Sequence, residues 1–152
     1  MTWAELSLQV EACQKCPLQG GNPVLGSGNL GADIMVIGEA PGREEASRGV
    51  PFVGASGRRL DQLLPLAKLR REDLYLTNTL LHRPPDNRTP YVGEQKACRA
   101  FLDEQLALDL HAGSPFALEN HSPFPARRRR RAACRVSACT LPHLGTCVIL
   151  SR

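Results

Sequence analysis

The sequence predicts an α/β fold in which parallel strands alternate with helices. Three observations support this class: the order helix, strand, loop, helix, strand, loop, helix along residues 1–110, two short apolar runs of strand type, and helices with one apolar face. Such alternation is typical of a parallel sheet. Because ligands of these sheets bind beyond the carboxyl ends of the strands, we expect the site in the loops that follow, 38–54 and 78–90.

The first predicted element is a helix over residues 2–12, where Thr2 and Glu5 have the spacing of a capping box. The first apolar run, 33–37, predicts a strand buried on both faces of the sheet. The second run, 74–78, predicts a further strand. Both runs are followed by polar, proline-containing loops.

Two more helices are predicted between and after the strands. Ser56 can cap the first of them, and Pro65 should end or kink that helix near Leu64. The second spans residues 94–110. Its inward-facing apolar residues are predicted to be Ala97, Phe101, Leu102 and Leu106.

The positive charge lies in the last part of the chain. The formal net charge is +4, from 19 basic and 15 acidic residues. Seven arginines follow Glu119, the last acidic residue, so residues 1–119 hold 12 basic against 15 acidic residues, a net of −3. Bulk charge is therefore no argument for nucleic-acid binding by that part. The run Arg127–Arg131 could bind phosphates, but we favour a solvated, disordered run.

Composition also excludes several classes of protein. No apolar run approaches the ~18–20 residues that span a bilayer, so we expect no membrane protein. The N-terminal residues lack the pattern of a signal peptide, so we expect a cytoplasmic location. With seven aromatic residues, an extended stacking surface for single strands is not expected. Six cysteines in such a chain indicate metal or redox chemistry more than disulfides.

Six motifs occur in series over roughly residues 1–110. They are Cys13-x-x-Cys16-Pro-Leu18, Gly38-Glu-Ala-Pro-Gly42, Pro51-Phe-Val-Gly54 with Gly57, Thr77-Asn78, Arg83-Pro-Pro-x-Asn87-Arg-x-Pro90 and Glu94-x-x-x-Cys98. In order and spacing they resemble the uracil-DNA glycosylase superfamily, and most closely its iron–sulfur family 4. The resemblance implies a three-layer α/β sandwich with a central parallel sheet. It also implies hydrolysis of the N-glycosidic bond of deoxyuridine in DNA repair.

The resemblance further implies a role for each residue of a base pocket. Phe52 would stack on the uracil, Asn78 would hydrogen-bond its edge and separate it from cytosine, and Glu45 would help to exclude the methyl group of thymine. Glu39 and Asn87 match positions near the attacking water, where a carboxylate can stabilise positive charge on the sugar. The alternatives are a core residue for Phe52, a strand-end cap for Asn78 and a surface charge for Glu45.

The same resemblance implies a [4Fe–4S] cluster of structural role. Cys13, Cys16 and Cys98 match three of its ligands. The fourth position is usually a cysteine and is His82 here; histidine can ligate cluster iron, as Rieske centres show. The alternatives are a three-cysteine cluster that is easily lost, and zinc bound by the three cysteines and His82.

Residues 111–152 do not match the family. Its members continue with an apolar strand that ends in Leu-Gly, a His-Pro loop whose histidine stabilises the departing uracil anion, and a DNA-contacting segment. Residues around His121 and Pro142 have some of these letters without the flanking pattern, and only Cys147–Leu150 resembles a strand. We therefore predict that the C-terminal strands are missing or replaced, and that this tail is disordered or frameshifted. Translation of the other two frames beyond codon 110 tests the frameshift.

The sequence thus predicts a monomeric glycosylase that acts on uracil in single- or double-stranded DNA, with little or no activity because of its C-terminal part. The rival hypothesis is a non-catalytic iron–sulfur or zinc protein, a nucleic-acid-binding remnant that uses the same cysteines. The His-Pro loop discriminates between them, since an enzyme needs it and a remnant does not.

Overall fold

Helices and strands alternate along residues 1–112 of the computed structural model, which describes residues 1–18, 21–112, 135–141 and 145–151. The alternation confirms the predicted α/β class. Short 3₁₀ helices accompany the main elements. In chain order the elements are α1 (Trp3–Glu11), β1 (Ser27–Gly28), β2 (Ile34–Gly38), α2 (Arg43–Arg48), α3 (Ala55–Leu63), η1 (Leu64–Ala67), η2 (Arg71–Asp73), β3 (Leu74–Asn78), η3 (Pro85–Asn87), α4 (Val92–Ala112), β4 (Arg135–Leu141) and β5 (Gly145–Ser151).

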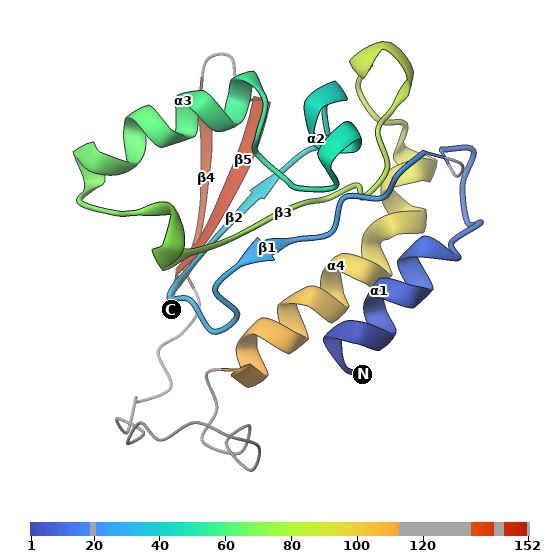
Figure 1. Cartoon of the computed structure of the whole chain (residues 1–152), viewed down its shortest axis with the longest axis horizontal. Helices are drawn as coiled ribbons and strands as arrows, with labels where there is room; N and C mark the ends of the chain where they lie inside the picture. The colour runs from blue at the N-terminus through green and yellow to red at the C-terminus, as the bar shows by residue number, and fades with distance from the viewer. Residues whose placement is uncertain (19–20, 113–134, 142–144, 152) are drawn as a thin grey trace.

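The strands form one sheet with the order β1-β3-β2-β5-β4 (Figure 1). β2 and β3 are parallel and place Gly38 opposite Asn78 at their carboxyl ends, which confirms the parallel pairing of the two apolar runs. The other pairings are antiparallel. For β4 and β5 the reason is that three intervening residues are too few for the crossover that parallel strands need.

Helices cover both faces of this sheet, which gives the three expected layers (Figure 1). Side chains of successive strand residues point to opposite faces. On one face, Val36 of β2 packs with Leu60 of α3. On the other face, Met35 packs with Leu102 of α4, and α1 adds Trp3. The two apolar layers pack against β2 and β3 from both faces of the sheet. This packing holds the residues at the carboxyl ends of the two strands in place.

Several local predictions are confirmed. α1 begins with the predicted capping box, in which Glu5 N donates to Thr2 Oγ1 at 3.3 Å and Thr2 N donates to Glu5 Oε2 at 2.7 Å. α3 ends at Leu63, and Pro65 lies in the 3₁₀ turn that follows. Proline has no backbone N–H and cannot continue the α-helical ladder, which explains the change of helix type.

Two local predictions are wrong. Ser56 is not the N-cap of α3, because the chain enters the helix earlier, from extended backbone at Gly54. The segment 38–54 is not a plain loop, because it contains the six-residue helix α2. Six residues are too few for a clear helical period, and this helix depends on hydrogen bonds that its own side chain Glu45 makes.

Beyond the end of α4, the part of the tail that the structure describes consists of two strands. The run Cys147–Leu150 lies within β5, as predicted, and β5 pairs with β2. β4 has no counterpart in the sequence prediction. The arginine run 127–131 and the residues around His121 and Pro142 lie outside the described residues. Whether residues 111–152 are frameshifted stays a prediction.

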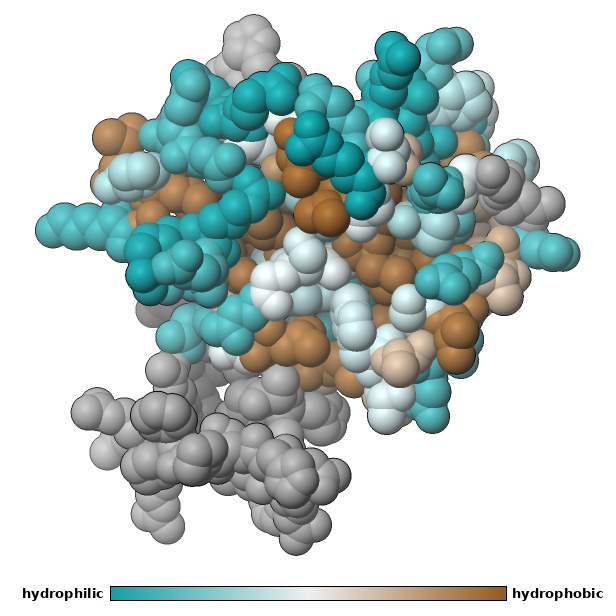
Figure 2. All heavy atoms as spheres, viewed as in Figure 1, coloured by the Kyte–Doolittle hydropathy of each residue, from teal (hydrophilic) through white to brown (hydrophobic). Residues whose placement is uncertain are grey.

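Hydrophilic side chains cover the outer surface of α3 on the face shown in Figure 2. The sequence of this helix alternates buried Gly57 and Leu60 with exposed charges such as Arg58 and Arg59. Among the described residues, no helix combines the length and apolar character that crossing a membrane requires.

Candidate functional site

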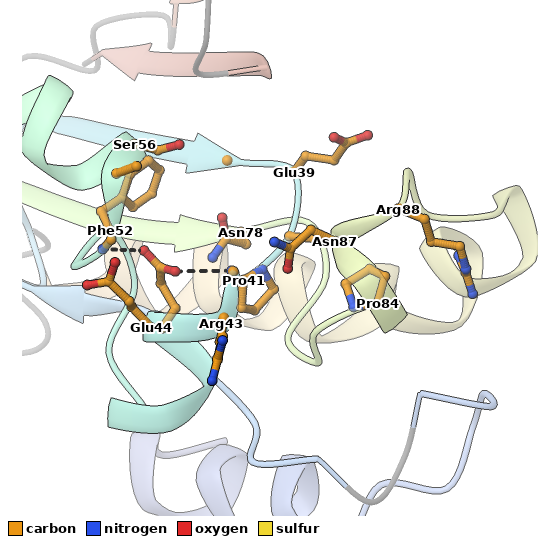
Figure 3. A pocket seen from close by; sticks show the side chains of 16 residues that line it. Glu39, Pro41, Arg43, Glu44, Phe52, Ser56, Asn78, Pro84, Asn87 and Arg88 are labelled. Atoms are coloured by element: carbon orange, nitrogen blue, oxygen red, sulfur yellow. Dashed lines mark hydrogen bonds between the residues drawn. The ribbon is translucent and has the colours of Figure 1, made fainter.

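A cavity of about 410 Å³ lies at the carboxyl ends of β2 and β3 (Figure 3). This volume is within the ~300–1,000 Å³ that is typical of small-molecule sites. The turn after β2, helix α2, the loop before α3 and the loop after β3 form its walls. The five residues predicted for base binding and catalysis all line it, namely Glu39, Glu45, Phe52, Asn78 and Asn87.

Phe52 and Asn78 converge above Gly38. A Cβ atom at Gly38 would overlap the amide oxygen of Asn78 and would lie 2.9 Å from Phe52 Cζ. The missing side chain of this glycine therefore makes the room in which the ring and the amide sit. Phe52 is 8% exposed and also packs against the core cluster beside α3, so the ring is both a core residue and a wall of the cavity. Figure 3 shows Phe52 and Asn87 on either side of Asn78.

Glu45 is a buried anchor and not a surface charge. It is 8% exposed, and its carboxylate accepts three backbone hydrogen bonds, from Gly42 N at 3.1 Å, Val53 N at 3.1 Å and Gly54 N at 2.6 Å. The dashed lines in Figure 3 mark hydrogen bonds of this wall, between the turn at Pro41 and the loop at Phe52. One carboxylate thus caps α2 and joins it to the loop that carries Phe52. Exclusion of the thymine methyl group stays a prediction.

Arg71 holds the same loop from the other side. Its guanidinium donates to the carbonyl oxygen of Pro51 at 3.2 Å and to that of Phe52. A second nitrogen donates to Asp61 Oδ1 of α3 at 2.7 Å. Phe52, whose carbonyl oxygen Arg71 contacts, has a φ of +55°. This value lies in the left-handed region that non-glycine residues seldom occupy.

The backbone of Glu39 is fixed at the end of β2. Its carbonyl oxygen accepts from Leu80 N at 3.0 Å and from Thr79 Oγ1 at 2.6 Å. These bonds continue the pairing of β2 and β3 beyond their last residues, and they fix the turn from which the Glu39 side chain extends. The half-buried side chain lines the cavity.

Asn87 lies in a loop whose shape depends on local hydrogen bonds. Asn87 has a φ of +53°, and its Oδ1 accepts from Arg83 Nε at 2.7 Å. The amide nitrogen and the second lone pair of the oxygen are the groups that this side chain can offer to a ligand.

The loop that carries Asn87 is attached to α4 by an ion pair. Arg88 pairs with the 4% exposed Glu94 at 2.6 Å and lies 3.8 Å above the ring of Tyr91. Tyr91 N also donates to Glu94 Oε2 at 2.8 Å. The hydrogen bond from Arg88 lowers the pKa of the Glu94 carboxyl, with a smaller contribution from the backbone of Tyr91.

The three predicted cysteine ligands lie in one corner of the fold, between α1 and α4. Cys98 is 4% exposed and belongs to an apolar cluster against which Cys13 and Cys16 also pack. Burial raises the pKa of the Cys98 thiol, and the nearby Cys16 and Cys13 raise it further, whereas a hydrogen bond from the backbone of Leu81 lowers it. All three are free thiols. We call this region the cysteine corner.

His82 directly follows Leu81 in the chain and is 4% exposed. Burial lowers the pKa of its imidazole, which favours the neutral form that binds metals. Three thiols and a neutral imidazole are a donor set that suits an iron–sulfur cluster. Among the described residues, however, no three His, Cys, Asp or Glu side chains form a group that could hold one metal ion.

Comparison with known protein families places the cavity in context. The model of the family described as "Uracil DNA glycosylase superfamily" matches residues 25–112, which is more than half of this chain. This chain belongs to the uracil-DNA glycosylase superfamily. The matched span contains the five predicted residues that line the cavity, together with His82 and Cys98. Cys13 and Cys16 precede this span.

Individual members of the superfamily are similar over about 100 residues. Proteins named "Type-4 uracil-DNA glycosylase" from Thermotoga maritima, Archaeoglobus fulgidus and Pyrobaculum aerophilum are 46%, 47% and 42% identical to this chain. The aligned parts cover 68%, 64% and 65% of this chain and 55%, 50% and 52% of those proteins. This chain therefore spans about half the length of the curated relatives it matches.

Sequence reasoning missed two residues that hold the walls of this cavity. Arg71 was not recognised, because its contacts with residues 51 and 52 join segments 19 and 20 positions apart, and one arginine of an Arg-Arg-Glu-Asp stretch carries no pattern. The anchoring role of Glu45 was also missed. Its position at N3 of a helix that begins at a Gly-Pro-rich turn was the one available signal.

Proposed function

We propose that this chain is a DNA-repair glycosylase that removes uracil from DNA by hydrolysis of the N-glycosidic bond. The convergence of Phe52 and Asn78 over Gly38, in a cavity that Glu39 and Asn87 also line, carries the proposal. Membership of the superfamily and the names of the relatives support it. The substrate would be uracil-containing DNA, single- or double-stranded, acted on by a monomer in the cytoplasm.

Recognition would begin when the uracil leaves the base stack and enters the cavity. The ring of Phe52 offers a flat apolar face for stacking. The amide of Asn78 can match the donor and acceptor of the uracil edge, and cytosine would leave it unpaired. Because three N–H groups fix the Glu45 carboxylate, this side chain cannot move aside for the methyl group of thymine.

In the proposed reaction, a water oxygen bonds to C1′ of the sugar. The C1′–N1 bond breaks, and its electron pair leaves with the uracil. The Glu39 carboxylate would stabilise the positive charge that develops on the sugar, and Asn87 would orient the water through its amide group, whose oxygen also accepts from Arg83. The proton of the water passes to solvent or to the departing base.

We also propose that Cys13, Cys16, Cys98 and His82 hold a [4Fe–4S] cluster, which would tie α1 to α4 and to the loop after β3. Zinc is the alternative. The ligands of one zinc ion lie ~2.3 Å from it, so they must approach one another closely, and no described group does so. The thiolates of a four-iron cluster bind different iron atoms and can lie farther apart, which favours the cluster.

The test is a single-turnover assay of the full chain with single-stranded DNA that contains one uracil. We expect uracil-specific binding but little release, because the sequence of residues 111–152 contains no recognisable His-Pro motif, and the loss of one oxyanion donor lowers rates by ~10²–10³. The Thermotoga maritima relative is the positive control, and N78A is the negative one. Rapid release would contradict the predicted impairment. Binding of DNA without release and without any preference for uracil would favour the remnant hypothesis.

A further inference from the structure

We propose that Arg71 and Glu45 are positioning residues that hold the backbone of Phe52 in a strained conformation and thereby fix its ring in the cavity. The proposal rests on the proposed function, which it extends from the residues that face the base to those that hold them. Neither residue needs to touch the base for this role.

The backbone of Phe52 needs an external cause for its conformation. Its φ of +55° lies in the left-handed region, where the side chain of an L-residue comes close to the following carbonyl. Such conformations cluster at functional sites, and they persist only where the surrounding structure determines them. Phe52 follows Pro51 and precedes Val53, and neither neighbour favours a left-handed turn as glycine or asparagine would.

Opposite charges hold the peptide groups on the two sides of Phe52. After it, Glu45 Oε1 accepts from the N–H groups of Val53 at 3.1 Å and Gly54 at 2.6 Å. The Arg71 guanidinium donates to the carbonyl oxygen of Pro51, the preceding residue, and to that of Phe52 itself. The anion thus takes the donors and the cation takes the acceptors, so each charge fixes the direction of the peptides that it contacts.

Arg71 is itself held in place. Asp61 of α3 accepts from its second nitrogen at 2.7 Å, and the arginine side chain is 34% exposed. The planar guanidinium has the donors to reach an acid and two carbonyls at once, which a lysine ammonium does less well. The adjacent Arg70 differs, because it is 70% exposed and pairs with Glu72 and Asp73 at the surface.

The position of the Phe52 ring depends on the conformation of the Phe52 backbone. If the backbone of Phe52 relaxed to negative φ, its Cα–Cβ bond would turn and the ring would leave its place above Gly38. Uracil would then have to restore the ring position on binding, and its affinity would fall. Relief of one strained residue corresponds to a loss of about 10- to 100-fold in uracil-specific binding.

The experiment compares wild type with R71M, with R71K and with the matched control R70M. In each ¹⁵N-labelled full chain, the intraresidue Hα–HN NOE of Phe52 reports its backbone, because these two protons are closest at positive φ. Fluorescence anisotropy then gives the affinity for a single-stranded oligonucleotide with one deoxyuridine, relative to the same strand with thymidine. We expect R71M to lose the strong NOE and about 10- to 100-fold of the uracil preference, R71K to lose less, and R70M to lose neither.

A strong Phe52 NOE in folded R71M would overturn the proposal, even if that variant is less stable, because Arg71 would then be merely structural. If wild type binds the two oligonucleotides equally, the proposed function fails, but the NOE comparison still decides whether Arg71 positions Phe52. If R71M does not fold, two milder variants replace it. E45Q weakens the hydrogen bonds from Val53 and Gly54, and D61N weakens the contact that holds Arg71. Retention of the strong NOE in both would overturn the proposal.

Discussion

The cavity at the carboxyl ends of β2 and β3 and the cysteine corner differ in how far their predicted residues are already arranged. In the cavity, Glu45 and Arg71 fix the walls through hydrogen bonds between charged side chains and backbone. In the cysteine corner, apolar packing brings Cys13, Cys16 and Cys98 near one another, but no described group of three ligands could hold a single ion. The cavity is formed by protein groups alone, whereas we propose that the corner is completed by its cofactor.

The physical reason lies in the charges of the groups involved. A carboxylate and a guanidinium are charged at neutral pH and find backbone partners as the chain folds. Thiols bind metal only as thiolates, and burial and the neighbouring cysteines raise the pKa of Cys98. Under the proposal, binding of the cluster would release the proton of Cys98 and draw the ligands together.

The largest expected effect is on the cysteine corner. C98A removes the buried thiol of α4, and we expect the purified protein to lose its iron and its brown colour entirely. Iron analysis and visible absorbance measure the loss of iron. C134A is the control, because Cys134 belongs to none of the six motifs that resemble the glycosylase superfamily. Full iron content in C98A would remove the proposed contrast between the two regions.

The next effect concerns the cavity. In G38A the new Cβ would displace the far ends of Phe52 and Asn78, which are side-chain atoms that can move without unfolding the chain. We expect about 10- to 100-fold weaker binding of uracil-containing DNA and an almost unchanged melting temperature. Anisotropy against a thymidine strand separates specific from general DNA binding. Unchanged specific binding would show that the cavity is not preformed for a base.

A smaller effect tests how firmly α3 supports the cavity. In G57A the new Cβ would overlap the backbone carbonyl of Phe52, and backbone cannot move aside as a side-chain tip can. We expect a loss of about 1–3 kcal/mol in the free energy of unfolding. G93A in α4 is the matched control, since nothing lies within 4 Å of its Cβ, and alanine should favour that helix. Equal stabilities in a denaturant titration would contradict a tightly packed Phe52 loop.

The smallest effect concerns residues 83–91, which join the two regions. The hydrogen bond from Arg88 lowers the pKa of Glu94 below its ordinary value of 4.5. The ionised form therefore stabilises the fold above pH 4.5, and this contribution is lost as the pH falls through the lowered pKa. We expect wild type to melt higher than E94Q at pH 7, and the difference to shrink below about pH 4.5. A difference that does not depend on pH would assign the effect to packing.

The sequence predicted which residues line the cavity better than it predicted which contacts hold them in place. The capping box, the two apolar strand segments and the effect of Pro65 follow from local patterns, because they depend on neighbours within a few positions. Glu45 was expected near the base, which stays a prediction, and the structure adds that its carboxylate accepts from three backbone N–H groups. Helix α2 was missed because it is short and depends on this tertiary anchor.

The sequence by itself determined the α/β class, and it placed the site in the loops 38–54 and 78–90, because residues that follow parallel strands meet at one edge of a sheet. The series of motifs, through the resemblance to the glycosylase superfamily, supplied five of the residues that line the cavity. Only the tertiary structure decided which groups hold these residues. The left-handed backbone of Phe52 and its bonds to Arg71 join segments that are distant in the chain. Such contacts depend on where the folded sheet and α3 place the loops, which no local pattern encodes.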